Sequence, residues 1–204
     1  MIADVHWLGH ASFKITGTQV IYMDPWKVKD GEKADLILIT HPHHDHCSQD
    51  DVAKIWKNGT EIVAVADCEE KLLEEILVVS PGDTRTVQGI PIEVVPAYNT
   101  DKPFHPVKNA WAGFVVTVAG ARIYHAGDTD WIPEMVDVRA DIALLPIGGT
   151  YTMTASEASQ AAVAIAPKTA IPMHWGDIVG SRADAEQFAK RCAGKVVVEI
   201  LGAE

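Results

Sequence analysis

Four histidines and an aspartate crowd into residues 41–46, in the stretch Thr40-His-Pro-His-His-Asp-His46. Neutral imidazole is a ligand for zinc, iron and related first-row metals, and a mixed nitrogen and oxygen set suits a site that keeps one position open for water. Histidines that repel one another when protonated gain nothing from such clustering without a cation. The stretch therefore predicts a metal site rather than a solvated polar turn.

The order T-H-x-H-x-D-H resembles the signature of the metallo-β-lactamase superfamily. The resemblance extends along nearly the whole chain and implies an α/β fold, the four-layer αββα sandwich, with the metal site at one edge of the sheets. It also implies that His41 and His43 bind a first metal and that Asp45 and His46 bind a second, while His44 fills a variable position.

Two later motifs match the same superfamily in the same order. Asp128, in the stretch Ala-Gly-Asp-Thr at residues 126–129, matches the aspartate that bridges both metals. His174, in Pro-Met-His-Trp at residues 172–175, matches the last ligand of the second metal. Either motif alone is a weak signal, but behind the first motif the two become specific.

One further ligand of the first metal has no direct counterpart. The superfamily expects a histidine where this chain has Tyr98 or Asn99, and His105 is the only histidine between residues 47 and 124. The long loop 98–109 could fold His105 back over the metals. The alternatives are that His105 faces the substrate, or that Tyr98, Asn99 or water completes a weaker first site.

Further motifs resemble a subgroup of metal-dependent hydrolases related to L-ascorbate 6-phosphate lactonase and, more distantly, to N-acylphosphatidylethanolamine phospholipase D. The resemblance implies that His10 is a catalytic or supporting residue at the mouth of the site, and that Asp24 braces the ligand loop by hydrogen bonds. Ordinary turn chemistry is the alternative for Asp24. Tyr98, Asn99 and Tyr151 are candidates for binding substrate.

The expected reaction is hydrolysis of a phosphoester or a lactone in a small metabolite. Two divalent metals, zinc first and manganese, iron or nickel as alternatives, lower the pKa of a shared water toward ~7. Asp45 would orient that water and assist proton transfer. Two other readings stay open: a catalytically weak metal-binding or sensing module, and a redox di-iron relative, although such relatives carry H-x-E where this chain has His41-x-His43.

The chain of 204 residues has a formal net charge of −11 and a hydrophobic share of 48%. An acidic protein repels nucleic acids and anionic lipids, so neither is an expected partner. No apolar run reaches the ~20 residues of a membrane helix, the first residues lack a secretory signal, and three cysteines without metal-type spacing fit a reducing compartment. We expect one cytoplasmic domain over residues 1–204 that acts on a small molecule, with a homo-oligomer left open.

The elements that position these residues follow from periodicity and turn signals. We expect a strand meander over residues 2–24 and a buried strand over 35–40 that leads into the histidine cluster. His6, His125 and Cys47 are expected to be structural. The remaining expected elements are strands at 61–66, 91–95, 110–118, 122–125 and 142–145 and helices at 50–57, 67–77, 154–166 and 181–192.

Overall fold

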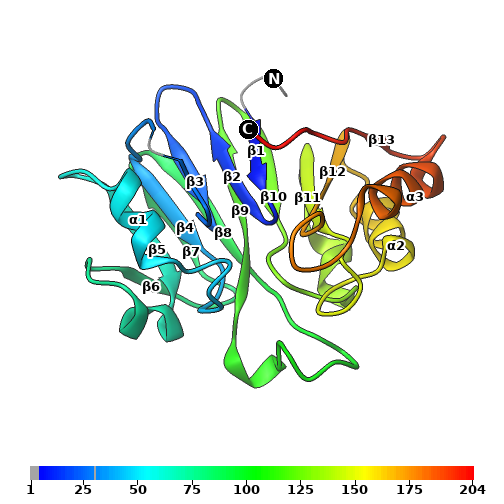
Figure 1. Ribbon diagram of the computed structural model, residues 1–204, viewed down its shortest axis with the longest axis horizontal. Coiled ribbons are helices and arrows are strands. Elements are labelled where there is room, and N and C mark those ends of the chain that lie inside the picture. Colours follow the sequence, from blue (N-terminus) through cyan, green and yellow to red (C-terminus); the bar gives the residue numbers. More distant parts are fainter. Residues whose placement is uncertain (1–4, 30) are drawn as a thin grey trace.

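Two β-sheets pack face to face in the computed structural model, which describes residues 5–29 and 31–204. Helix α1 (Gln49–Ile55) lies outside one sheet, and helices α2 (Ala155–Ile165) and α3 (Arg182–Cys192) lie outside the other (Figure 1). This arrangement confirms the four-layer αββα sandwich. Among the described residues, every helix is too short or too polar to cross a membrane.

Each sheet is built from consecutive strands of one half of the chain. The six-stranded sheet has the order β1 (Val5–Gly9), β2 (Ser12–Ile15), β3 (Ile21–Met23), β4 (Leu36–Ile39), β5 (Glu61–Val65) and β6 (Leu77–Val79). The seven-stranded sheet has the order β13 (Val197–Val198), β12 (Thr169–Met173), β11 (Ile142–Pro146), β10 (Ala121–His125), β9 (Ala112–Val118), β8 (Ile90–Pro96) and β7 (Thr84–Val87). Short 3₁₀ helices are η2 (Ala66–Lys71), η3 (Val107–Asn109) and η4 (Pro133–Asp137).

The central strands are apolar along their whole length. Every residue of β4, β11 and β12 is buried. These strands run parallel to their neighbours and are covered on both faces, by the opposite sheet and by the helices, which is why their sequences do not alternate. Strands β4 and β12 end directly before residues of the candidate site, His41 and His174.

Strands that run in one direction deliver these residues to a single edge. In the first sheet β1, β3 and β4 point the same way, since β2 lies antiparallel between β1 and β3, and β3 and β4 are parallel. In the second sheet β8, β10, β11 and β12 share a direction by the same reasoning. The carboxyl ends of all these strands therefore lie at one edge of their own sheet, and the two edges meet where His46 approaches Asp128 to 3.3 Å.

The start of helix α2 forms as the sequence predicts. Thr154 accepts a hydrogen bond from the backbone N–H of Glu157, and the Glu157 carboxylate accepts one from the Thr154 N–H. This capping box satisfies backbone donors that have no partner inside the helix. The helix ends at Ala166, in a left-handed conformation just before Pro167.

The expected helix over residues 67–77 is wrong. Only a 3₁₀ turn, η2, forms there, and the chain then continues into β6 at the edge of the first sheet. Cys68 and Leu72 face the core, whereas Leu73 is 87% exposed, so the segment has too narrow an apolar face to hold a longer helix against the sheet. Strands β6, β7, β12 and β13 are additional to the expected set, and residues 2–4 of the expected first strand lie outside the described residues.

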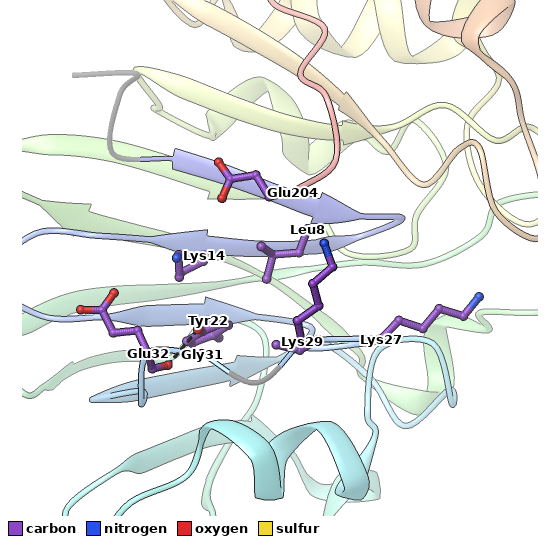
Figure 2. Close-up of a pocket in the computed structure, with 9 residues that line it drawn as sticks. Leu8, Lys14, Tyr22, Lys27, Lys29, Gly31, Glu32 and Glu204 are labelled. Atoms are coloured by element: carbon purple, nitrogen blue, oxygen red, sulfur yellow. Dashed lines mark hydrogen bonds between the residues drawn. The ribbon is translucent and has the colours of Figure 1, made fainter.

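A shallow pocket lies over the face of β1, β2 and β3 that carries Lys14 (Figure 2). Lysines and glutamates share its lining, among them Lys14, Lys29, Glu32 and Glu204, so the pocket has no single sign of charge. Lys27 also lines it but points away from Lys14 and Lys29 in Figure 2. Its ammonium group instead pairs with Asp177.

Candidate metal centre

Histidine and aspartate side chains from both sheets form two adjoining groups at the shared edge. One group contains His41, His43 and His105, and the other contains His10, Asp45, His46 and His174. Within each group one potential ligand atom per residue lies within 4.8 Å of all the others. A third group of the same kind, His41, His46 and Asp128, joins these two, and His105 lies with the histidines of the first group.

Asp128 lies between the two groups. One of its oxygens, Oδ2, is 3.2 Å from Nε2 of His105 in the first group and 3.1 Å from Nε2 of His174 in the second. Its other oxygen, Oδ1, is 3.3 Å from Nε2 of His46. The carboxylate thus lies within 3.3 Å of imidazoles from both groups.

Nε2 of His41 lies 3.0 Å from Nδ1 of His43, but several other donor atoms at this centre have no hydrogen-bond partner among the described residues. Nε2 of His46, His105 and His174 and Oδ1 of Asp128 are all buried, yet none has a hydrogen-bond partner among the described residues. Buried polar atoms are ordinarily paired. Two ligand atoms bound to one tetrahedral zinc at ~2.0–2.1 Å lie ~3.3 Å apart, close to the 3.1–3.3 Å between the imidazole nitrogens and the Asp128 oxygens. The residues present therefore fit metal binding.

In three of the histidines a second ring nitrogen is held by another side chain. Nδ1 of His46 lies 2.7 Å from Oδ2 of Asp24, and Nδ1 of His41 lies 2.9 Å from the Thr40 hydroxyl. In the same way Nδ1 of His105 lies 3.0 Å from Oδ1 of Asn99. Such partners fix the ring orientation and keep the opposite nitrogen available as a metal ligand.

Asp24 braces the ligand loop, as expected from the sequence. Besides His46, it accepts hydrogen bonds from the backbone N–H and the hydroxyl of Thr40, at 2.8 and 2.7 Å. Asp24 follows β3 and Thr40 follows β4, so this carboxylate fastens the start of the histidine stretch to the neighbouring strand.

Several of these residues occupy unusual backbone conformations. The φ angles of His10, Asp24 and His174 are 51°, 45° and 59°, in the left-handed region. Residues other than glycine rarely adopt it, and when they do they cluster at functional sites. Asp24 directly follows β3 and His174 directly follows β12, so both side chains lie at the end of a sheet.

The charge states of the buried groups also suit cation binding. Burial by itself raises the pKa of Asp128, but the charges of His174 and His46 and hydrogen bonds lower it well below its ordinary value. Burial, with the charge of His46, lowers the pKa of His41 well below its ordinary value. Asp128 is therefore ionised and His41 neutral, which are the forms that bind metal.

His46 differs from His41 because two carboxylates face it. Burial opposes its protonation, yet the charges of Asp128 and Asp24 raise the pKa of His46 well above its ordinary value. A proton on His46 thus balances buried negative charge. Metal binding would displace that proton, so the affinity for metal is expected to rise with pH.

The loop of residues 98–109 positions His105 through Asn99. The Asn99 side-chain oxygen accepts a hydrogen bond from the His105 backbone N–H at 2.9 Å, and its amide nitrogen donates to the Tyr151 carbonyl at 2.9 Å. Asn99 was a candidate substrate-binding residue, but its polar atoms are engaged inside the protein. The Tyr98 hydroxyl bonds to Glu134, outside the lining of the pocket over the donor groups.

His10 lies behind Asp45 rather than at the mouth of the pocket. Its Nε2 is 3.0 Å from Oδ2 of Asp45, and its ring packs 3.9 Å, centroid to centroid, from that of His174. The imidazole is 2% exposed. It therefore contacts two members of the second group.

Two residues expected to be structural are confirmed as such. Both ring nitrogens of His125 are engaged, Nε2 with the Ala11 carbonyl and Nδ1 with the Gly127 backbone N–H. Cys47 is buried in the hydrophobic core directly after His46.

Trp111 is a residue of the site that the sequence analysis missed. Its ring centroid lies 5.1 Å from that of His41, 4.9 Å from that of His43 and 5.6 Å from that of His105. Its indole N–H donates to Asp67 at 2.8 Å, which fixes the ring as a wall behind the first group. The feature of the sequence that could have indicated Trp111 is its position between the loop 98–109 and strand β9.

A pocket of about 230 Å³ opens over the donor groups. Asp45, His105, Asp128 and His174 contribute to its floor, and Tyr151 is part of its lining. Its remaining lining residues are His43, His44, Phe104 and Ile178. The volume is below the ~300–1,000 Å³ of typical ligand pockets, so it suits a very small molecule or the reacting end of a larger one.

Close packing around His174 leads to a first prediction. A Cβ added at Gly148 would lie 2.6 Å from the His174 carbonyl oxygen and 2.7 Å from Cγ2 of Val179. We expect Gly148→Ala to displace His174, to weaken metal binding and to lower the free energy of unfolding by about 1–3 kcal/mol. Metal content and denaturant unfolding measure the two effects.

The control is Gly17→Ala, because an added Cβ there meets its first neighbour only at 4.0 Å. Gly17 is exposed and is not one of the donor residues. Equal stability and equal metal content in the two variants would show that Gly148 does not hold His174 in place.

Comparison with known proteins extends these observations. Residues 4–174 match the family model described as the beta-lactamase superfamily domain. The chain is 41% identical to a UPF0173 metal-dependent hydrolase from Thermoplasma acidophilum, over 96% of this chain and 92% of the relative. It is 37% identical to another from Pyrococcus abyssi, over 97% and 95%.

Solved structures give the same result. A metal-dependent hydrolase from Parabacteroides distasonis superimposes with a TM-score of 0.88 at 36% identity, over 96% of this chain and 91% of the other. Igni18, a metallo hydrolase from Ignicoccus hospitalis, superimposes with a TM-score of 0.79 at 24% identity, over 98% and 94%. The second likeness concerns the fold alone.

Proposed function

The chain belongs to the metallo-β-lactamase superfamily, among the UPF0173 metal-dependent hydrolases, and we propose that it holds two divalent cations and hydrolyses an ester-type bond in a small molecule. The observation that carries this proposal is the pair of donor groups on either side of Asp128. A single cation would leave one of these groups without a role.

The first cation is assigned to His41, His43 and His105, and the second to Asp45, His46 and His174, with Asp128 shared. Imidazole predominates in the first group, and nitrogen and oxygen donors mix in the second. Such sets favour zinc, with manganese, iron and nickel as the alternatives that metal analysis distinguishes.

Two cations at these positions would lower the pKa of a bound water toward ~7 and stabilise negative charge that develops on the substrate. Asp45 lines the pocket, and His10 fixes the direction of its carboxylate. Burial raises the pKa of Asp45, but the hydrogen bond with His10 and the charge of His46 lower it below its ordinary value. Because its pKa is low, the Asp45 carboxylate stays ionised at neutral pH. It is therefore suited to orienting an attacking water and less suited to holding a proton.

The lining of the pocket favours a lactone or carboxylic ester over a phosphomonoester. Among the described residues that line it, none is a lysine or an arginine, whereas Phe104, Tyr151 and Ile178 contribute apolar surface. Phosphate groups are commonly recognised by basic side chains, above all by arginine. A neutral ester places less charge against this lining.

Metal analysis and a substrate panel test the proposal together. Protein purified without chelator is expected to contain about two equivalents of divalent metal per chain, because the donors suffice for a paired site. It is expected to hydrolyse members of a panel of lactones, carboxylic esters, phosphodiesters and phosphomonoesters, with lactones or esters fastest. Chelation should abolish turnover, and added metal should restore it.

The outcomes separate the alternatives. Failure to bind metal after reconstitution at neutral pH would refute the metal centre itself. Full metal occupancy without turnover on any member of the panel would instead favour a binding or sensing module. Turnover that is indifferent to chelation would rule out metal-dependent hydrolysis.

A further inference from the structure

The pocket over the donor groups combines a polar floor with exposed apolar side chains. The lining residues that are not metal donors are His44, Phe104, Tyr151 and Ile178. Phe104 and Ile178 are large apolar side chains, yet they stay 40% and 49% exposed. Phe104, Tyr151 and Ile178 together are called the apolar rim below. Exposed apolar side chains that gather at one site, unlike single ones, mark a surface that a ligand covers.

Two members of the apolar rim are fixed relative to the donor groups. The Phe104 ring meets the Tyr151 ring edge to face, with centroids 4.7 Å apart. Phe104 directly precedes His105 in the chain. The Tyr151 carbonyl accepts a hydrogen bond from the side chain of Asn99, which also holds His105. These aromatic rings therefore keep their place beside the first donor group.

Ile178, the third member, has a backbone conformation that disfavours its own type of side chain. Its φ is 63°, and across it the Val179 N–H donates to the Asp177 carbonyl at 2.7 Å. A hydrogen bond over one residue of positive φ is typical of the γ-turn form that is rare and strained. A β-branched residue is an outlier in this region, which asparagine or glycine adopts more readily. The backbone therefore does not account for an isoleucine here.

The loop that presents Ile178 follows His174 and is held from two sides. Lys27 pairs with Asp177 on one side. On the other side, a Cβ added at Gly180 would lie only 2.9 Å from Cβ of Trp175, so the loop packs closely against the chain before it. Strained residues persist where the surrounding structure fixes them, and they cluster at ligand sites.

The size and charge of the pocket indicate which part of a substrate meets the apolar rim. A volume of about 230 Å³ holds the reacting bond and few further atoms. The rest of a larger substrate must extend past the exposed side chains of Phe104 and Ile178. Within the described part of the chain, the lining includes no lysine or arginine that could pair with an anionic group there.

We propose that the substrate is a neutral ester or lactone with an apolar alkyl substituent beside the scissile bond, and that Ile178 and Phe104 select it by covering that substituent. This inference rests on the proposed function, because it names the substrate class of the same site. An alkyl group gains free energy for each methylene removed from water, whereas a charged group in its place would lose hydration without a partner.

Three hydroxamic acids test the proposal by binding alone, since a hydroxamate binds metal ions through two oxygens and is not an ester. Acetohydroxamic acid has the shortest chain, and hexanohydroxamic acid adds four methylenes. Adipic monohydroxamic acid has the longer chain but ends in a carboxylate. Calorimetry on the zinc-loaded protein measures the three affinities.

Hexanohydroxamic acid is expected to bind about tenfold more tightly than acetohydroxamic acid, because four partly covered methylenes contribute less than full burial would. The carboxylate of adipic monohydroxamic acid should remove this gain. Equal affinities of the three acids, or tightest binding of the acid with the carboxylate, would overturn the inference. Failure of all three to bind would overturn it together with the metal centre.

Ile178→Asn is the matching variant, because asparagine tolerates a positive φ. The preference for the longer chain should fall to about threefold or less, while metal content is retained and the free energy of unfolding is not lowered. Val107→Asn is the control, since Val107 is 66% exposed and does not line the pocket, and it should keep the tenfold preference. A full preference in Ile178→Asn, or loss of stability and metal there, would contradict the selecting role of Ile178.

Turnover separates a failure of this inference from a failure of the proposed function. Methyl hexanoate should exceed methyl acetate in kcat/KM by about the same tenfold. Hydrolysis of both esters with equal kcat/KM would overturn the inference and leave the proposed function intact. Tighter binding of hexanohydroxamic acid without turnover of any ester or lactone would support the apolar rim as the site of an alkyl group and contradict the proposed hydrolysis.

Discussion

Replacing Asp128 by alanine is expected to abolish hydrolysis and to release bound metal while the fold persists. The carboxylate faces both donor groups and brings ionised oxygen to a cluster of imidazoles. Without it, two cations would repel each other across the centre with no shared anion between them. Loss of a residue that only supports a ligand costs ~10–100-fold in affinity or activity, and loss of a shared ligand should exceed this.

Metal content by mass spectrometry, turnover and circular dichroism together measure this result. Asp128→Asn retains the shape and one oxygen donor, so it should keep more metal than the alanine variant while turnover stays low. Asp101→Ala removes an exposed carboxylate and should change neither quantity. Wild-type turnover and wild-type metal content in Asp128→Ala would disprove the dinuclear centre.

Replacing His105 by alanine should remove one class of bound metal and reduce turnover in parallel. Its Nε2 is buried without a hydrogen-bond partner among the described residues and lies 3.2 Å from Oδ2 of Asp128. If this atom is a ligand, its loss should cost more than the ~10–100-fold typical of a supporting residue. Titration of metal into the metal-free variant, with activity measured at each step, resolves the two classes.

Two neighbours make this test specific. Asn99→Leu removes the hydrogen bonds that orient His105 but no ligand, so its loss of affinity should be about 10–100-fold and smaller than that of His105→Ala. His44→Ala is the control, because that side chain is 78% exposed and should be dispensable for metal binding. If His105→Ala keeps all its metal and loses only kcat or raises KM, His105 contacts substrate instead.

Local patterns in the sequence determined much of the fold. The apolar runs before His41 and Asp128 form buried strands, and the Thr154 capping box starts a helix. These features depend on backbone hydrogen bonding and on side-chain periodicity over a few residues, which any sequence displays directly. The helix expected over residues 67–77 does not form. A helix there would be stable only if it packed an apolar face against the edge of the sheet, and the sequence does not display that packing.

The motif also predicted that His41, His43, Asp45 and His46 lie together as candidate metal ligands, and the structure brings them into one cluster. It left His105 open, because a loop residue has no periodicity, and its position depends on the hydrogen bonds that Asn99 makes with it and with Tyr151. The bond from Asn99 to Tyr151 joins residues that are 52 positions apart in the chain.

A second pocket, lined by Trp7, Trp26 and Trp175 among others, was decided by tertiary structure alone. Trp7, Trp26 and Trp175 lie in three distant parts of the chain, and nothing in their spacing relates them. They meet because β1, β3 and β12 end at the same edge of the sandwich. The sequence thus determines which types of side chain are available for chemistry. The packing of strands and loops determines which side-chain atoms face a common centre.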